Sequence, residues 1–191
     1  MEFADKHPNI QVVGVDFCPM MPEWVAPNCR FQVDDIEKEW LWKQSFDLIH
    51  ARLLSGSFGD PKTVIEQCFQ HLTPGGYIEL KDILFTPKSD DGTLLGVSPL
   101  CEWANDLADA ARQMGRPLIG NASEYENMLI EAGFEVVNVL KHKLPTNAWP
   151  RDKTMQESGM RCTLARKVLQ CRAVHAYFPY ITVLARKPQT V

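Results

Sequence analysis

The sequence predicts an α/β protein built around a doubly wound, mostly parallel sheet. Short apolar segments alternate with amphipathic helical segments along the chain, which is typical of folds with a parallel sheet. Several of these apolar segments are followed directly by a carboxylate. Because ligands of such sheets bind beyond the carboxyl ends of the strands, the acidic residues there are the first candidates for a functional site.

The first third of the chain contains three predicted strands. Residues 1–8 are typical of the end of a helix, and the turn at Pro8 leads into a strand at residues 10–15, which Asp16 follows. Three prolines exclude a regular helix between residues 18 and 28. Two further strands, at residues 30–33 and 46–50, also end at polar residues.

The best-defined helix of the sequence covers residues 60–72. Asp60 is suited to the N-cap and Pro61 to the first helical position, and apolar side chains recur on one face. The segment Pro74-Gly75-Gly76 then predicts a tight entry into a strand at residues 77–84.

The second half of the chain is predicted to alternate in the same way. A helix is expected at residues 101–114, and another begins at Ser123, whose spacing from Glu126 indicates a capping box, and ends at Gly133. A strand at residues 134–139, a weakly patterned helix at residues 154–172 and a final strand at residues 176–185 complete the prediction.

Composition limits the classes of function. The 191 residues suffice for a single domain covering residues 1–191, and the net charge of −4 favours a small-molecule substrate over nucleic acid. The cysteines and His175 match no zinc-binding spacing, so no metal site is expected. Without a signal peptide or an apolar run of about 20 residues, we expect a cytoplasmic or nuclear protein that does not bind membranes.

Three segments together resemble the class I S-adenosylmethionine-dependent methyltransferases, and more narrowly their fungal LaeA-like branch. They are residues 11–16, 45–52 and 72–80, and the resemblance extends over most of the chain. It implies a Rossmann-like methyltransferase sheet with an antiparallel last strand and S-adenosylmethionine as the cofactor. No glycine precedes Gly14, so the glycine-rich loop of the family is missing and an N-terminally truncated version of the fold is expected.

The resemblance assigns cofactor contacts to three acidic residues. Asp16 is expected to accept hydrogen bonds from the ribose hydroxyls, and Asp34 with Asp35 from the adenine amine. Considered without the family, Asp16 could equally cap a turn, and Asp34 and Asp35 could form a solvated acidic loop.

Further candidates lie where methyl transfer would occur. His50 is the candidate catalytic base, and its neighbours Ala51 and Arg52 are expected at the cofactor, although a histidine at a strand end often only satisfies backbone groups. Asp82, near the end of its strand, and Trp149, with its large flat ring, are the candidate substrate contacts.

Three functions are compatible with these residues. The first is a methyltransferase that acts on a small molecule, in fungal secondary metabolism as the branch implies. The second is a non-catalytic methyltransferase-like protein whose sheet a protein partner or self-association completes, since unpaired central strands would leave the chain marginally stable. The third, a nicotinamide-dependent reductase, would also need the missing glycine-rich loop.

Overall fold

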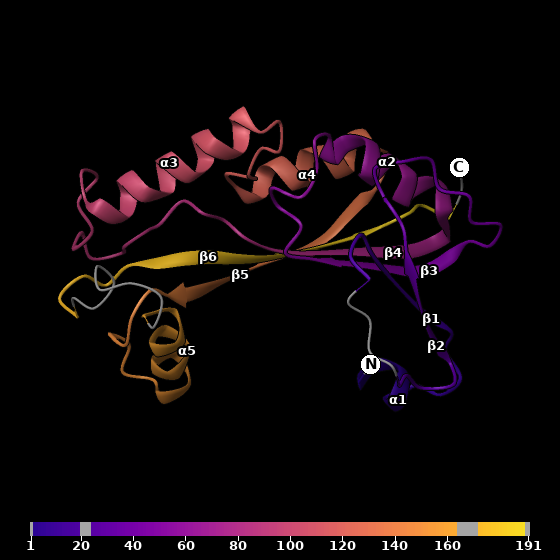
Figure 1. Cartoon of the computed structure of the whole chain (residues 1–191), viewed down its shortest axis with the longest axis horizontal. Coiled ribbons are helices and arrows are strands. Elements are labelled where there is room, and N and C mark those ends of the chain that lie inside the picture. Colours follow the sequence, from indigo (N-terminus) through magenta and orange to yellow (C-terminus); the bar gives the residue numbers. More distant parts are fainter. Residues whose placement is uncertain (1, 20–23, 164–171, 190–191) are drawn as a thin grey trace. The chain divides into compact units, whose positions relative to one another are not determined.

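The computed structural model describes residues 2–19, 24–163 and 172–189 (Figure 1). The chain divides into two compact units, unit 1 at residues 1–41 and unit 2 at residues 42–191. The single domain expected from the sequence stays a prediction. Within the described ranges, none of the helices combines the length and the apolar character needed to cross a membrane.

Unit 1 contains one short helix and a pair of parallel strands. They are α1 (Glu2–Lys6), β1 (Val12–Asp16) and β2 (Cys29–Val33). The buried amide of Asn28 joins them, because its Nδ2 donates hydrogen bonds to the carbonyls of Ala4, His7 and Ile10 at 3.1, 3.0 and 2.7 Å. One polar side chain thus provides hydrogen bonds to the backbone carbonyls at the end of α1 and in the turn before β1.

Unit 2 is built on a four-stranded sheet in the order β3-β4-β6-β5. The strands are β3 (Phe46–Arg52), β4 (Leu72–Ile83), β5 (Glu135–Pro145) and β6 (Tyr177–Arg186). β3 and β4 pair in parallel, whereas β6 is antiparallel to both β4 and β5. Strands β3, β4 and β5 therefore point the same way, and the antiparallel last strand expected from the sequence is confirmed.

Helices lie on both sides of this sheet (Figure 1). α2 (Pro61–His71), α3 (Pro99–Gln113) and α4 (Ala122–Glu131) are on one side, and α5 (Lys153–Thr163) is on the other. The face toward the first three helices forms the core, with the following side chains at most 1% exposed: Leu72, Ile78, Leu129, Ile181, Val183 and Ala185. The helix predicted at residues 154–172 is described only up to Thr163, and residues 164–171 lie outside the described residues.

Local sequence explains the ends of the helices. Asp60 caps α2 as predicted, since its Oδ1 accepts a hydrogen bond from the amide of Lys62 at 3.1 Å and Pro61 follows. The cap predicted at Ser123 is wrong, because the cap lies two residues earlier, at Asn121, which accepts a hydrogen bond from the amide of Glu124 at 3.2 Å. Gly133 follows α4 with a φ of 99°, as expected.

The Pro74-Gly75-Gly76 segment forms a bulge within β4. Phe46 pairs with Leu72 but Leu48 already pairs with Tyr77, so the extra residues of β4 are looped out of the ladder. Gly75 has a φ of 83°, and a Cβ on Gly76 would lie 2.9 Å from the carbonyl oxygen of Thr73. Only glycine suits both positions, which explains the tight entry that the sequence predicts.

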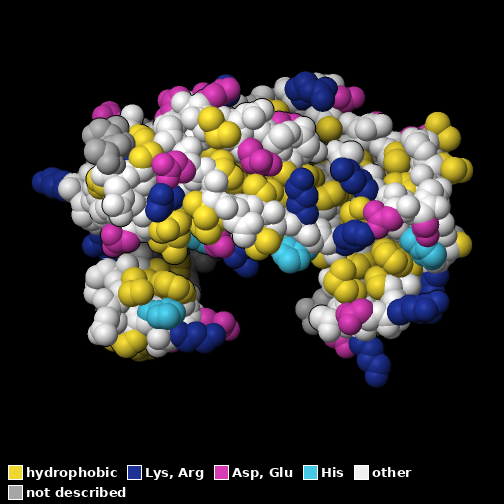
Figure 2. Space-filling view, turned by 180° about the vertical axis from the view of Figure 1, so that it is seen from behind, with side chains coloured by type: hydrophobic (Ala, Val, Ile, Leu, Met, Phe, Trp, Pro, Cys, Tyr) yellow, Lys and Arg dark blue, Asp and Glu magenta, His cyan; other side chains and the backbone are white. Residues whose placement is uncertain are grey.

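The surface mixes both signs of charge. On the face shown in Figure 2, acidic and basic side chains are interspersed, and its described part carries no extended basic patch. Several large apolar side chains are also exposed, including Trp24, Leu41 and Val97, whose exposed fractions are 85, 84 and 83%.

Candidate active site

Two of the predicted acidic residues are neighbours at the carboxyl end of the β1–β2 pair. Asp16 is the last residue of β1, and Asp34 directly follows β2. The backbone amide of Asp34 donates a hydrogen bond to the carbonyl of Asp16 at 3.1 Å. Asp16 and Asp34 therefore lie at the same end of the two-stranded β1–β2 sheet, because parallel pairing brings the ends of the two strands together, whereas their expected place at the edge of the larger sheet stays a prediction.

The carboxylates at this edge are held by short local hydrogen bonds. Asp16 Oδ1 accepts from the amide of Cys18 at 2.8 Å, and Asp34 accepts from the amide of Asp35 at 2.9 Å. Asp35 Oδ1 in turn accepts from the amide of Glu37 at 3.1 Å. Among the described residues, Oδ2 of Asp16 accepts no hydrogen bond, so this exposed carboxylate keeps an acceptor for a hydroxyl or amine of a ligand.

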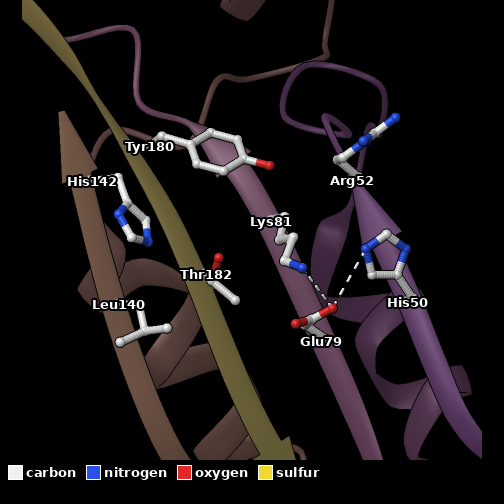
Figure 3. A pocket seen from close by; sticks show the side chains of 8 residues that line it. All are labelled: His50, Arg52, Glu79, Lys81, Leu140, His142, Tyr180 and Thr182. Carbon is white, nitrogen blue, oxygen red and sulfur yellow. Dashed lines mark ion pairs between the residues drawn. The ribbon is translucent and has the colours of Figure 1, made fainter. Parts of the chain in front are cut away.

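A pocket of about 380 Å³ lies on the sheet of unit 2 (Figure 3). Its residues alternate along β4 with Ile78 and Leu80, whose side chains face the core, so it lies on the other face of the sheet. The pocket is lined by two residues from each strand: His50, Arg52, Glu79, Lys81, Leu140, His142, Tyr180 and Thr182.

Cross-strand register assembles the pocket from distant parts of the sequence. Arg52 is opposite Lys81, Lys81 is opposite Thr182, and Thr182 is opposite Leu140. One line of side chains thus crosses all four strands, and residues two positions away on each strand share the same face.

Glu79 links two basic groups at the centre of the pocket. Its Oε2 lies 3.0 Å from Lys81 Nζ and 3.5 Å from His50 Nε2 (Figure 3). Burial lowers the pKa of His50, and the charges of Lys81 and Arg52 lower it further against the opposing effect of Glu79. His50 is therefore neutral near pH 7, the state in which an imidazole can accept a proton.

The structure groups His50 and Arg52 but separates Ala51 from them. Strand alternation turns the side chain of Ala51 to the opposite face of β3. The cofactor contacts predicted for Ala51 and Arg52 stay predictions.

The sequence reasoning missed most of the lining. Polar residues at every second position of β4 and β6 were a usable signal for Lys81, Tyr180 and Thr182. His142 lay beyond the predicted end of its strand at residue 139, whereas β5 continues to Pro145.

Asp82 occupies a different environment from its neighbours. It is only 3% exposed, and its Oδ2 accepts hydrogen bonds from the amides of Leu54 and Ser55 at 3.2 and 2.8 Å and from the hydroxyl of Tyr125 at 2.8 Å. Burial and the negative charge of Asp82 raise the pKa of Tyr125 well above its usual range. Asp82 thus anchors the loop that follows β3, and its predicted contact with a substrate stays a prediction.

Trp149 is fixed beside the amino end of β6. Its indole nitrogen donates a hydrogen bond to the carbonyl of Ala176 at 2.9 Å, and its ring stacks on His175 with 5.1 Å between the centroids. The Nδ1 atom of His175 contacts the carboxylate of Asp91. One face of the Trp149 ring is therefore occupied by a neighbour, and its substrate contact also stays a prediction.

Comparison with known proteins identifies relatives in fungi. A family described as "Methyltransferase domain" matches residues 2–139. Methyltransferase pytC of Aspergillus terreus is 31% identical over 98% of this chain and 68% of its own length. The secondary metabolism regulator LAE1 of Cochliobolus heterostrophus is 36% identical over 83% of this chain and 52% of its own. The chain thus spans about two thirds of the first relative and about half of the second.

Solved structures share the fold at low sequence identity. A phosphoethanolamine N-methyltransferase 2 of Haemonchus contortus, in complex with S-adenosyl-L-methionine, has a TM-score of 0.63 at 19% identity over 98% of this chain and 46% of its own. An S-adenosylmethionine-dependent methyltransferase of Mesorhizobium loti has a TM-score of 0.57 at 20% identity over 97% and 84%. These similarities confirm the Rossmann-like fold class that the sequence predicts.

Proposed function

The chain belongs to the methyltransferase-domain family, and from this premise we propose that it is an S-adenosylmethionine-dependent methyltransferase acting on a small molecule in fungal secondary metabolism. The relative pytC is named a methyltransferase, and LAE1 is named a regulator of secondary metabolism. The observation that carries the proposal for this chain is the placement of Asp16 beside Asp34 at the carboxyl end of parallel strands.

The acidic residues of unit 1 are suited to an adenosine group. A ribose offers two hydroxyl donors, and the exocyclic amine of adenine offers another, so a ligand of this kind needs acceptors at two neighbouring points. Asp16 would bind the ribose hydroxyls, and Asp34 with Asp35 would bind the amine. Their carboxylates are already oriented by backbone amides, which reduces the entropy lost when a ligand binds.

The residues of unit 2 are suited to hold and deprotonate an acceptor. S-adenosylmethionine, when bound, supplies a methyl group on a sulfonium that is already a good leaving group. The protein must then align the nucleophile and remove its proton where it carries one. His50, with its lowered pKa, is the proposed proton acceptor. The ion pair with Lys81 holds the carboxylate of Glu79 beside the imidazole of His50.

Calorimetric titration with S-adenosylhomocysteine tests the cofactor. Asp16→Asn should weaken binding at least about tenfold, because hydrogen bonds to a charged acceptor contribute about 1.5–3 kcal/mol each. Glu39→Gln, which removes an exposed carboxylate from the same unit, is the matched control and should leave the affinity unchanged. Equal affinities of Asp16→Asn and the parent chain would remove Asp16 from the site.

A second candidate is a methyltransferase-like protein without catalysis, which works with a partner chain or a second copy. The observation that favours it is that several relatives at 35–37% identity are named regulators rather than methyltransferases. Sedimentation of the purified chain with and without S-adenosylmethionine separates the two candidates. A stable self-associated form that does not bind the cofactor would favour the second.

A further inference from the structure

The pocket of unit 2 carries two cations on adjacent strands. Arg52 is the register partner of Lys81, and both side chains line the same pocket (Figure 3). Like charges directly opposite one another on neighbouring strands destabilise a sheet. In the structure the ammonium of Lys81 is turned toward Glu79 and the exposed guanidinium of Arg52 points away from it, which keeps the two charges apart (Figure 3). An anion beside Lys81 would allow the side chain of Arg52 to turn toward it without this repulsion.

The protein itself compensates only one of these charges. Glu79 is the single carboxylate among the lining residues, and it lies 3.0 Å from Lys81 Nζ. Within the described part of the chain, the guanidinium of Arg52 forms no ion pair. Arg52 and Lys81 outnumber Glu79, so the lining has a net positive charge, and the effect of Arg52 and Lys81 on the pKa of His50 reflects the same field.

Further donors and an apolar wall surround the two cations. Tyr180 and Thr182 carry hydroxyls, and His142 is the register partner of Tyr180 on the next strand. Leu140, which is 47% exposed, adds apolar surface beside the polar groups. A volume of about 380 Å³ is in the range of pockets that bind small organic ligands.

We propose that this pocket binds the acidic group of a small organic anion, a carboxylate or a phosphate, between Arg52 and Lys81. The guanidinium forms a bidentate pair with the acidic group, Lys81 contributes a second charge, and the hydroxyl of Tyr180 donates from the neighbouring strand. The apolar part of the ligand lies on Leu140. The identification of this anion as the methyl acceptor rests on the proposed function, whereas its binding does not.

Titration of the isotope-labelled chain with benzoate and, separately, with inorganic phosphate tests the proposal by nuclear magnetic resonance. Ionic strength is held constant with chloride. At least one probe should shift the signals of Arg52, Lys81 and Thr182 in a saturable way. Binding by benzoate alone identifies a carboxylate site, and binding by phosphate alone identifies a phosphate site. Absence of saturable shifts with both probes overturns the proposal.

Charge-removing variants show where the probe binds. Arg52→Gln and Lys81→Gln should each weaken binding about tenfold or more. Lys141→Gln is the matched control. Lys141 precedes His142 on β5 and its side chain therefore points to the other face of the sheet, so this variant loses one charge outside the pocket and should bind the probe as the parent does. If Arg52→Gln does not fold, Lys81→Gln carries the test. Unchanged affinity in the variants that fold overturns the proposal.

The cofactor analogue separates this inference from the proposed function. Because the titrations contain no cofactor, a chain that binds benzoate but not S-adenosylhomocysteine retains the anion site and loses only the proposed function. Displacement of benzoate by S-adenosylhomocysteine would assign the site to the carboxylate of the cofactor and overturn its assignment to the acceptor.

Discussion

Replacing Asp82 by alanine should be among the most damaging single changes in unit 2. Its Oδ2 accepts three hydrogen bonds, from the amides of Leu54 and Ser55 and from the hydroxyl of Tyr125. Each hydrogen bond to a charged acceptor contributes about 1.5–3 kcal/mol, but bonds that share one oxygen do not add fully. We therefore expect Asp82→Ala to lower the free energy of unfolding by about 3–5 kcal/mol.

A double-mutant cycle distinguishes this network from a general packing defect. Tyr125→Phe in the parent removes one donor and leaves the Oδ2 atom of Asp82 with the amides of Leu54 and Ser55, so it should cost about 1–2 kcal/mol. In the Asp82→Ala background, the hydroxyl of Tyr125 is buried without its acceptor. There, Tyr125→Phe should be neutral or stabilising, because it removes an unsatisfied polar group.

Denaturant unfolding followed by circular dichroism provides the measurement. The midpoint of the transition should fall while its slope stays constant, since the surface exposed on unfolding is unchanged. Asp60→Ala, which removes the N-cap of α2, is a control expected to cost about 1 kcal/mol. A loss below about 1 kcal/mol for Asp82→Ala, or equal effects of Tyr125→Phe in both backgrounds, would refute the reasoning.

Three further predictions concern single groups. If the chain binds S-adenosylhomocysteine, Asp16→Ala should weaken that binding more than His50→Ala, because Asp16 is proposed to hold the ribose and His50 the acceptor; calorimetry of both variants decides this. The pKa of His50, followed by nuclear magnetic resonance, should lie below its usual 6.5 and fall further in Glu79→Gln, which removes the group that raises it; a rise would contradict the assignment. Burial raises the pKa of the Cys68 thiol to about 12, so iodoacetamide should modify exposed Cys18 in the native protein and spare Cys68 until the chain unfolds.

The stability of the native state should also depend on alkaline pH through Tyr125. Its pKa is raised in the folded chain, so the unfolded chain loses this proton first, near pH 10, and stability falls as the pH rises above that value. Tyr125→Phe should reduce this alkaline loss, as measured by denaturant unfolding at several pH values. An identical pH dependence in the variant would show that other groups dominate.

Features set by neighbouring residues could be predicted from the sequence alone. Asp60 and Pro61 specify the start of α2, and Pro74-Gly75-Gly76 specifies a tight backbone before Tyr77, because capping and positive φ depend on the residues at those positions. The sequence did not predict that β4 already begins at Leu72 and contains this segment as a bulge. The position of Asp16 at a strand end also follows from its place after an apolar run. Even here, the cap of α4 lies at Asn121, two residues before the predicted Ser123.

The tertiary structure decided which of two alternating faces each strand residue joins. Glu79 and Asp82 lie three positions apart on β4, so they point to opposite faces, one into the pocket and the other beneath the helices. The local sequence around Glu79 and Asp82 does not show which of the two carboxylates is exposed in the pocket and which is buried in hydrogen bonds.

The pocket itself depends on pairings between strands that are far apart in the sequence. Arg52, Lys81, Thr182 and Leu140 form one line only because the order β3-β4-β6-β5 and its register place them opposite one another. Hydrophobic periodicity identifies a strand and its two faces but carries no information about the neighbour of that strand. The sequence by itself therefore determined which helices and strands form, and the non-local hydrogen bonding of the sheet decided how far some strands extend and which side chains share a site.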